Sequence, residues 1–398
     1  MKASTLILLF LCSISGVKSY AQTKPLSLEM ARQTALRNHP VIQQGQSIID
    51  RQQTLVKTAS IFDPLNISGS FGQINTSASD YYVGISQSFK MPGVYKSEKN
   101  LLQHNVNIAS AGAAVTKNDL IKNVTTAYYS WLYAWQQFRL LDELDSIYQN
   151  FARYAEKKFD VGESGILEKT NARSQLVSVR LKKKQAEADM HIYESELRQW
   201  MVTGDRFVPP DDYIPLPAPG ISDSTGLLTN PLLLYDEQQI AYERAAVQVE
   251  KSRGLPSVSV GATTQSIDKV SPYYIFNAGV NIPIFKNGVK ARTKAAQINV
   301  QISEKELEKN KLQLYSTFDQ LNERYNKASD QLKYYNEEGL QFAAVILNGA
   351  NKGYNAGDIG YVEYIQNVNE AINIRSGYLQ TINEYNQTII QINYLLNR

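Results

Sequence analysis

The feature that most constrains the fold of this chain is an internal repeat, in which the second half of the sequence follows the first half landmark by landmark. Pro40 and Pro231 both precede a helical stretch. Pro64 and Pro256 both precede a segment of alternating residues. The other pairs of landmarks are Tyr81 with Tyr273, Gly93 with Gly288, and Phe159 with Tyr354. Partners stay 191 to 195 positions apart, and this nearly constant spacing indicates a tandem duplication.

Each repeat contains two segments in which apolar residues alternate with small or polar ones, as in a strand with two different faces. The four predicted strands are residues 65–73, 81–89, 257–265 and 273–284. Segments of about 9 to 11 residues have the length at which a tilted strand crosses a bilayer. After the N-terminal segment no apolar run is long enough for a transmembrane helix, so insertion into a membrane would use the strands.

Long helical patterns follow the strands. Between Val94 and Tyr154 the sequence has no proline, and apolar residues recur at three- and four-residue spacing. This pattern predicts a helix of roughly 60 residues, whereas helices of globular domains average about 11 to 12. Each repeat is therefore expected to read helix, strand, strand, long helix, glycine turn, long helix. Such a mainly α-helical chain is typical of a coiled coil or an elongated tube.

These elements divide the chain into four parts. The parts are a signal peptide at 1–21, a first repeat at 22–202, a proline-rich linker at 203–226 and a second repeat at 227–398. The helical hairpins of the two repeats are expected to turn near 159–166 and 354–361.

The N-terminal segment has the order of a secretory signal. Lys2 is followed by an apolar run, and Ala21 ends a small-x-small cleavage site. We expect cleavage after Ala21 and export of the mature chain. Cys12 stands beside bulky residues, which favours a residue of the signal core over a lipid attachment site.

Charge and cysteine content exclude several classes of function. Loss of Lys2 and Lys18 with the signal leaves 39 basic residues against 38 acidic ones, so the mature chain is nearly neutral. That balance offers no electrostatic footprint for nucleic acid. The mature chain would hold no cysteine, so a disulfide framework is excluded.

No residue pattern indicates catalysis. His39, His104 and His191 are far apart and have no ligand spacing to one another, so neither a metal site nor a cofactor site is predicted. Ser164 lies between two glycines, but the segment lacks the spacing of a nucleophile elbow and follows a helix instead of a strand. We therefore expect a protein that is not an enzyme.

The stretch FNAGVNIPIF raises the question of which solvent its strand contacts. Its apolar side chains are predicted to share one face: Phe276, Val280 and Ile282. The opposite face is predicted to hold Asn277, Gly279 and Asn281. In a soluble sheet the apolar face would meet a protein core, whereas in an outer-membrane barrel it would meet lipid and the polar face a lumen.

With these features in place, the chain resembles the TolC-like outer-membrane efflux proteins. LSLEMARQTALRNHP from Leu26 resembles the opening helix of that family, and IPIFKNGVKARTKAAQ from Ile282 resembles its passage from strand to helix. The paired turns FDVGESGILE and YNAGDIGYVE are similar to its hairpin tips. QSFKMPGV from Gln87 is similar to the branch that exports heavy-metal cations. Many relatives carry a lipidated cysteine at the mature N-terminus, which this chain is not expected to have.

The resemblance implies an outer-membrane homotrimer that contacts outer-membrane lipid and extends into the periplasm. Its strands would form one barrel, and its helices would form a tunnel docked onto a periplasmic adaptor and an inner-membrane pump. By position, the tips that dock the adaptor would hold Gly162, Gly165, Gly357 and Gly360. The candidate aperture acids are Asp160, Glu163 and Asp358. An acid at a helix N-terminus is also favoured by the helix dipole, so a capping role stays open.

Counting strands favours a trimer as well. The chain offers four, whereas single-chain membrane barrels begin at about 8. Two copies would give a barrel nearly filled by its own side chains, while three copies give 12 strands and leave a lumen. The small residues Ser68 and Gly84 on the polar face favour the open barrel.

Two other classes of protein are compatible with parts of this pattern. A general diffusion channel would need many more strands than the sequence offers. A soluble periplasmic coiled-coil scaffold would pack the strands as small sheets on its helices.

Overall fold

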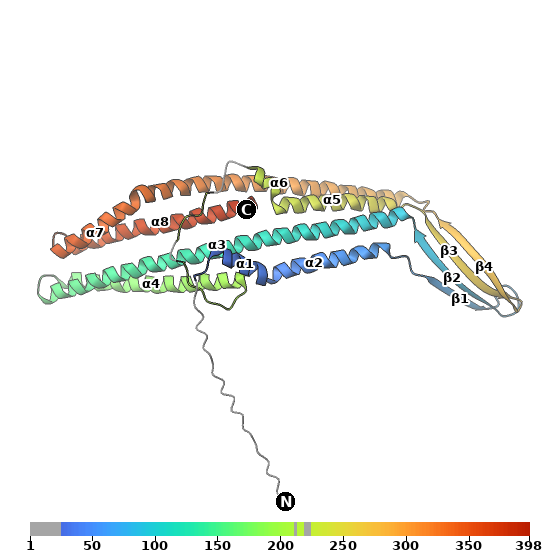
Figure 1. Ribbon diagram of the computed structural model, residues 1–398, viewed down its shortest axis with the longest axis horizontal. Helices are drawn as coiled ribbons and strands as arrows, with labels where there is room; N and C mark the ends of the chain where they lie inside the picture. The colour runs from blue at the N-terminus through green and yellow to red at the C-terminus, as the bar shows by residue number, and fades with distance from the viewer. Residues whose placement is uncertain (1–24, 211–212, 219–223) are drawn as a thin grey trace, which may run out of the picture.

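The structure, a computed structural model, describes residues 25–210, 213–218 and 224–398. The predicted signal peptide at 1–21 lies outside the described residues. Figure 1 shows an elongated molecule with a four-stranded sheet at one end and long helices, lying side by side, over the rest of its length. Among the described residues, no helix combines the length and the apolar character needed to cross a bilayer.

The first repeat contains four helices and two strands. In chain order they are α1 (Leu28–Asn38), α2 (Pro40–Val56), a 3₁₀ turn (Lys57–Ser60), β1 (Asn66–Gly72), β2 (Asp80–Lys90), α3 (Pro92–Asp160) and α4 (Ile166–Met201). His39 separates α1 from α2 because its backbone is extended and its Nδ1 accepts a hydrogen bond from the Val41 N–H, 3.3 Å away. Pro40 then opens α2 as its first residue, where a missing N–H costs nothing.

The second repeat has the same order of strands and long helices. Its elements are a 3₁₀ turn (Ser224–Thr229), α5 (Pro231–Ser252), β3 (Ser257–Ile267), β4 (Val270–Asn281), α6 (Asn287–Tyr334), a π-helical turn (Tyr335–Gly339), α7 (Leu340–Ala356) and α8 (Tyr361–Leu395). Asn230 has the place of His39, since its side chain accepts from the Leu232 N–H at 2.9 Å before Pro231 opens the helix. The start of this helix is therefore built in the same way in both halves.

The π-helical turn is a difference between the repeats. α3 is continuous for 69 residues, whereas the corresponding helix of the second half is interrupted between α6 and α7. Gly377 on α8 leaves the space that the Tyr335 hydroxyl occupies, and a Cβ at this position would overlap that hydroxyl. The π-helical turn therefore packs against α8 at a position where glycine leaves room for the Tyr335 side chain.

The four strands form one antiparallel sheet in the order β1-β2-β3-β4. The first repeat supplies β1 and β2, and the second supplies β3 and β4, so the two repeats are joined in the middle of the sheet. In the centre of the register, Gly84 lies opposite Thr263. Each outer strand, β1 and β4, has one edge to which no other strand of the described residues pairs.

The limits of β4 differ from the prediction of 273–284. The strand begins at Val270 because Asp268 and Lys269 both adopt positive φ, 51° and 61°, and close a tight hairpin turn. It ends at Asn281, before Pro283, which cannot donate to a strand partner. Ile282, predicted as a strand residue, therefore lies beyond β4, and that part of the prediction is wrong.

The hydrophobic core is distributed along the helices. Near the middle of the molecule, Trp131 and Tyr128 of α3 pack against α1 and the end of α4, and the Tyr128 hydroxyl donates to the Leu26 carbonyl at 2.9 Å. A separate cluster joins the start of α5 to α6 and the end of α8, and Asn230 Nδ2 donates to the Leu395 carbonyl at 2.9 Å. Both clusters lie where one helix ends and another continues its row.

The close approach of β2 and β3 at Gly261 can be tested by substitution. A Cβ at Gly261 would lie 2.9 Å from the Ile85 carbonyl oxygen, whereas a Cβ at Gly69 would come no nearer than 3.6 Å to the Tyr82 carbonyl oxygen. We expect Gly261→Ala to lower the free energy of unfolding by about 1 to 3 kcal/mol, because a backbone atom must move. Gly69→Ala is the control and should be nearly neutral. Thermal unfolding of the detergent-extracted protein, followed by circular dichroism, measures both, and equal melting temperatures would contradict the geometry.

Candidate functional site

The sheet has one apolar face, defined by the register of its strands. Ile67 lies opposite Ile85, Ile85 opposite Ala262, and Ala262 opposite Phe276, so these four side chains form one row across the sheet. Neighbouring rows complete this apolar face: Phe71, Val83, Val258, Val260, Ala278 and Val280. Phe276 is 85% exposed in the single chain. The helices therefore leave the middle of this face uncovered.

The opposite face is polar or small over most of its length, and toward the end far from the helices it also carries Tyr82, Tyr273 and Ile275. It holds Asn66, Ser68, Ser70, Gly84, Ser86, Ser88, Ser257, Ser259, Gly261, Thr263, Asn277, Gly279 and Asn281. Asn277 Nδ2 donates to the Thr263 hydroxyl at 3.3 Å, and the Ser259 hydroxyl donates to the Gly279 carbonyl at 3.5 Å. The register thus puts Asn277, Gly279 and Asn281 on one face and Phe276 and Val280 on the other.

At the end of the sheet far from the helices, Asp80 joins two loops. Its carboxylate accepts hydrogen bonds from the Ser266 hydroxyl at 3.0 Å, the Thr76 hydroxyl at 3.3 Å and the Lys269 N–H at 3.4 Å. The residue is 1% exposed. Sequence reasoning missed Asp80 because two of its partners, Ser266 and Lys269, lie in the other repeat and become neighbours only through the pairing of β2 with β3.

At the other end of the molecule, both helical hairpins turn in the same way. Gly162 and Gly357 follow the first helix of each hairpin with φ of +82°. The Glu163 N–H donates to the Lys158 carbonyl, and the Asp358 N–H donates to the Gly353 carbonyl, each at 2.8 Å. These bonds are those of a Schellman motif, which ends a helix at a glycine in the left-handed conformation.

Gly165 and Gly360 have a different role in the turns. Both precede the returning helix with negative φ, −85° and −78°, and neither helix has a side-chain cap. A Cβ at any of the four tip glycines would meet open space. Glycine is therefore required by backbone conformation at Gly162 and Gly357 only.

The candidate aperture acids occupy different surroundings. Asp160 pairs with Lys169 of α4 at 3.7 Å, and Lys169 also pairs with Glu156 at 3.3 Å, so these charges connect the two arms of the first hairpin. Glu163 and Asp358 are exposed. An aperture role for the three acids stays a prediction. The described residues contain no group of three or more His, Cys, Asp or Glu side chains that could hold a metal ion.

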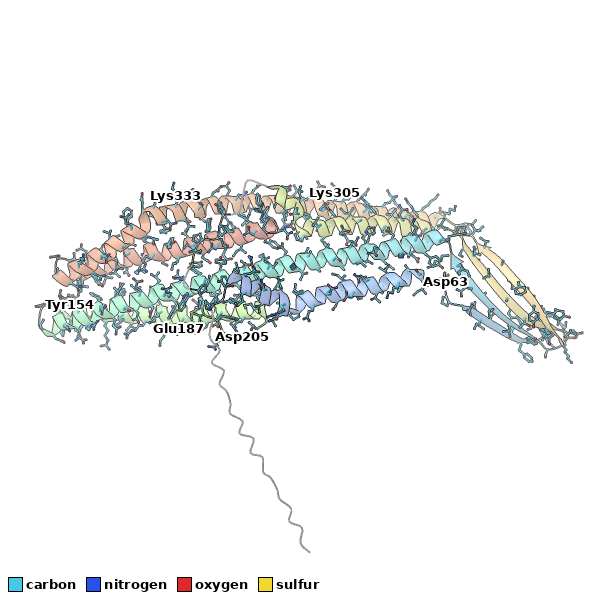
Figure 2. The ribbon with its side chains drawn as sticks, in the orientation of Figure 1. Asp63, Tyr154, Glu187, Asp205, Lys305 and Lys333 are labelled. Atoms are coloured by element: carbon cyan, nitrogen blue, oxygen red, sulfur yellow. The ribbon has the colours of Figure 1, made fainter. Side chains whose placement is uncertain are left out.

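Aromatic side chains connect the two hairpins near their tips. Phe151 of α3 meets Tyr354 of α7 edge to face at 5.2 Å, and Tyr354 stacks on Tyr364 of α8 at 4.7 Å. Tyr154, labelled in Figure 2 at the tip end, meets Tyr354 at 5.4 Å. The Tyr148 hydroxyl donates to Asn369 Oδ1 at 3.1 Å. Burial raises the pKa of Tyr148 and of Tyr364 to about 12, so both rings stay neutral.

A charged hydrogen bond completes this aromatic cluster. The Tyr354 hydroxyl donates to Glu168 Oε1 of α4 at 2.6 Å. Burial raises the pKa of Tyr354, and the bond to Glu168 raises it further. Sequence reasoning missed the cluster, although the recurrence of Tyr148, Phe151 and Tyr154 at three-residue spacing on one helix face was visible.

The turn glycines can be tested as a matched pair. Gly162→Ala puts a side chain where φ is +82°, which costs about 1 kcal/mol or more, whereas Gly165→Ala places its methyl group in open space at an ordinary φ. We expect faster amide exchange at the end of α3 in Gly162→Ala and little change in Gly165→Ala. Hydrogen exchange followed by mass spectrometry gives both values, and the opposite ranking would contradict the Schellman geometry.

The bond between the hairpins can be tested through its acceptor. Glu168→Gln keeps the shape but removes the charge that accepts the Tyr354 hydroxyl, and we expect the tip to lose about 1 kcal/mol of local stability. Glu163→Gln is the control because Glu163 is exposed. Amide exchange in residues 350–360 should rise in the first variant alone. Unchanged exchange in Glu168→Gln would show that the aromatic rings hold the tips without this bond.

Comparison with known proteins now adds to this geometry. The chain is 22% identical over 305 residues to the probable outer membrane lipoprotein SilC of Salmonella typhimurium, and the match spans 72% of this chain but just under two thirds of SilC, 65%. It is 21% identical over 323 residues to the cobalt-zinc-cadmium resistance protein CzcC of Cupriavidus metallidurans, spanning 78% of this chain and 75% of that protein.

The fold matches that of a solved channel, and a family model matches the sequence. The crystal structure of CusC has a TM-score of 0.79 and 18% identity, covering 94% of this chain and 92% of that one. The model of the outer membrane efflux protein family matches residues 31–201 and 224–398. The resemblance in the sequence is confirmed: the chain belongs to the outer membrane efflux protein family and has the fold of its TolC-like channels.

Proposed function

We propose that three copies of this chain form one outer-membrane channel, which conducts solutes delivered by a periplasmic adaptor and an inner-membrane pump. The observation that carries this proposal is the sheet, with its two different faces and its two unpaired edges. In lipid every backbone N–H and C=O must be paired, so an open edge is not viable and only a closed barrel can span. Further copies supply the missing partners.

The direction of the strands supports closure by copies. β1 leads away from the helices and β4 returns to them (Figure 1), so β1 of one copy pairs antiparallel with β4 of the next. On the apolar face β1 uses odd-numbered residues such as Ile67, and β4 uses even-numbered ones such as Phe276. Pairing odd with even residues makes the apolar face continuous around the ring. That face then meets lipid, and the polar face meets water.

The helices also form rows with free edges. In the half near the sheet, α3 packs between α2 and α5, and α5 packs against α6; in the half near the tips, α3 packs between α4 and α8, and α8 packs against α7. The edge helices carry exposed apolar side chains at helical spacing. On α4 these are Val177, Leu181 and Ile192, and on α6 they are Ile298, Ile302 and Leu312. In the trimer, α6 packs against α2 of the next copy, and α7 packs against its α4.

The tips are the docking surface for the adaptor. They lie at the end of the molecule opposite the sheet (Figure 1), where the periplasmic partner would approach. Gly162 and Gly357 give both hairpins the same backbone shape, so the two tips of each copy present similar turns. Bulky substitutions at both positions should abolish export while trimers remain in the outer membrane. Wild-type export with normal crosslinking to the adaptor would place the docking surface elsewhere.

The solute is a heavy-metal cation. This part of the proposal is supported by the similarity to CzcC, whose name records cobalt-zinc-cadmium resistance, and by QSFKMPGV from Gln87. Deletion of the gene should raise cellular cobalt, zinc or cadmium, measured by elemental mass spectrometry, and re-expression should reverse the rise. Normal metal content with raised content of an organic efflux substrate would refute the metal assignment and leave the channel function intact.

The solvent assignment can be tested with one pair of arginine substitutions. Phe276 is chosen because it lies in the middle of β4, near the midplane of the membrane. Val280 lies next to the last residue of the strand, close to the membrane boundary, where a charge costs little. Phe276→Arg should prevent insertion, because a charge on the lipid face near the midplane costs about 2 to 4 kcal/mol. Asn277→Arg is the control. Equal amounts of assembled protein in outer-membrane fractions would contradict the assignment.

The number of copies is tested directly by mass. The detergent-extracted complex should have three times the mass of the mature chain in native mass spectrometry or light scattering. A single copy would leave the outer edges of β1 and β4 without partners in lipid, so folded monomers should be absent from the membrane. A stable, membrane-inserted monomer would overturn the proposed function.

A further inference from the structure

An apolar groove lies at the base of the apolar face of the sheet, where the strands meet the helices. Its walls come from Phe89 of β2, Val258 of β3, Tyr95 of α3 and Phe62 of the segment before β1, with Met91 between the strand and the helix. The groove has a volume of about 510 Å³. We call it the junction groove.

Packing fixes the shape of the junction groove. The Phe62 ring meets Phe89 edge to face at 5.4 Å and Tyr95 at 5.9 Å. Gln87 Nε2 donates to the Asp63 carbonyl and holds the segment before β1 against β2. Figure 2 shows Asp63 where the helices give way to the sheet. Phe62 nevertheless remains 58% exposed, so the groove has formed walls and an open side.

The depth of the groove in the membrane follows from the length of β2. Tyr81 and Phe89 lie on the same face, eight positions apart. At about 3.3 Å per residue and a tilt of about 40°, this separation spans roughly 20 Å along the membrane normal. The apolar band of a membrane barrel is about 25 Å tall, so with Tyr81 at the outer boundary Phe89 lies about 5 Å inside the periplasmic one. The junction groove continues from Phe89 toward the helices and therefore lies where the acyl chains of the inner leaflet meet the headgroups.

One end of the groove favours negative charge. Lys90 lines it, and its ammonium lies 3.3 Å from Glu98 Oε1 with 37% of the side chain exposed. α3 begins at Pro92 beside the groove, its first turn holds no acidic residue, and Met91 provides no side-chain cap. Pro92 has no N–H and the Val94 N–H donates to the Met91 carbonyl at 2.8 Å, so the positive charge at this end comes from Lys90 and from the dipole of α3. The groove thus combines an apolar wall with a positively charged end.

We propose that the junction groove binds a phospholipid of the inner leaflet of the outer membrane. One acyl chain lies against Phe62, Phe89 and Val258, in continuity with the lipid-facing surface of the sheet, and the phosphate lies beside Lys90 and the first turn of α3. This inference rests on the proposed function, because the groove faces lipid only if the sheet is part of a barrel. Three symmetric copies give three lipid sites per channel.

The experiment measures lipid binding to assembled trimers. Delipidated trimers in detergent are titrated with palmitoyl-oleoyl phosphatidylglycerol, and bound lipids are counted by native mass spectrometry. We expect up to three tightly bound lipids. Val258→Trp fills the groove and should weaken this binding about tenfold, the effect of losing contact with roughly two methylene groups. Val260→Trp is the control: it makes the same change two residues away on the same face, outside the groove, and should leave binding unchanged.

The headgroup is tested by changing the charge. Lys90→Gln should weaken binding of phosphatidylglycerol and leave binding of palmitoyl-oleoyl glycerol, which lacks the phosphate, unchanged. If Val258→Trp does not assemble, Met91→Trp fills the groove from its other wall and replaces it. Equal lipid binding by the wild type and a trimeric groove-filling variant would overturn the proposal, as would equal losses in Val258→Trp and Val260→Trp.

A neighbouring copy is the other possible occupant. Phe285, 90% exposed beyond β4, would approach the segment before β1 of the next copy. With Phe62→Cys and Phe285→Cys in the same chain, a disulfide between copies in lipid-free trimers would show that protein fills the groove, and would overturn lipid binding. If trimers are intact but bind no lipid, the lipid site is refuted and the proposed function stands. If the detergent extract contains no trimers, both the proposed function and the lipid site are refuted.

Discussion

The pairing of backbone groups in lipid is the constraint on which the rest of the structure depends. A strand that crosses a bilayer needs a partner on both edges, and each repeat of this chain supplies only two strands. The repeats therefore join at β2 and β3 within one sheet, and in the proposed trimer the two outer edges pair with other copies. In that proposal duplication and assembly go together, because the four strands of one chain fall short of the about 8 with which single-chain barrels begin.

The long helices connect the sheet to the hairpin tips at the other end of the molecule. α3 spans 69 residues, about 100 Å at 1.5 Å per residue, and runs without interruption from the base of the sheet to the hairpin tip. Other helices lie end to end in rows beside it, and one buried cluster fills the joint between α8 and α5. One rigid helix thus sets the distance between the membrane part and the tips.

Local patterns in the sequence predicted much of this architecture. Period-two alternation in FNAGVNIPIF placed Phe276 and Asn277 on opposite faces, which the register of the sheet bears out. The two glycines in the left-handed conformation can also be predicted from the sequence, because Gly162 and Gly357 occupy matching places in two similar turns. These features are short-range, and the chemistry of a few neighbouring residues determines them.

The features that were missed depend on contacts between the repeats. Asp80 becomes a link between loops only when β2 pairs with β3, about 185 positions away in sequence. The bond from Tyr354 to Glu168 likewise joins opposite halves of the chain. The alternation continues through Ile282 and predicts a strand there, but β4 ends at Asn281, before Pro283. Periodicity shows which residues share a face, but it does not show which segment lies opposite or where a strand stops.

The π-helical turn at Tyr335–Gly339 has a consequence for the stoichiometry of docking. It interrupts the helix of the second hairpin, while the first hairpin stays regular, so the proposed ring of three copies would alternate between two kinds of arm and have three-fold symmetry instead of six-fold. A partner that recognises the turn common to both arms finds six equivalent places on the ring. A partner that recognises only the interrupted arm would find three, so one duplicated hairpin would offer two stoichiometries of docking.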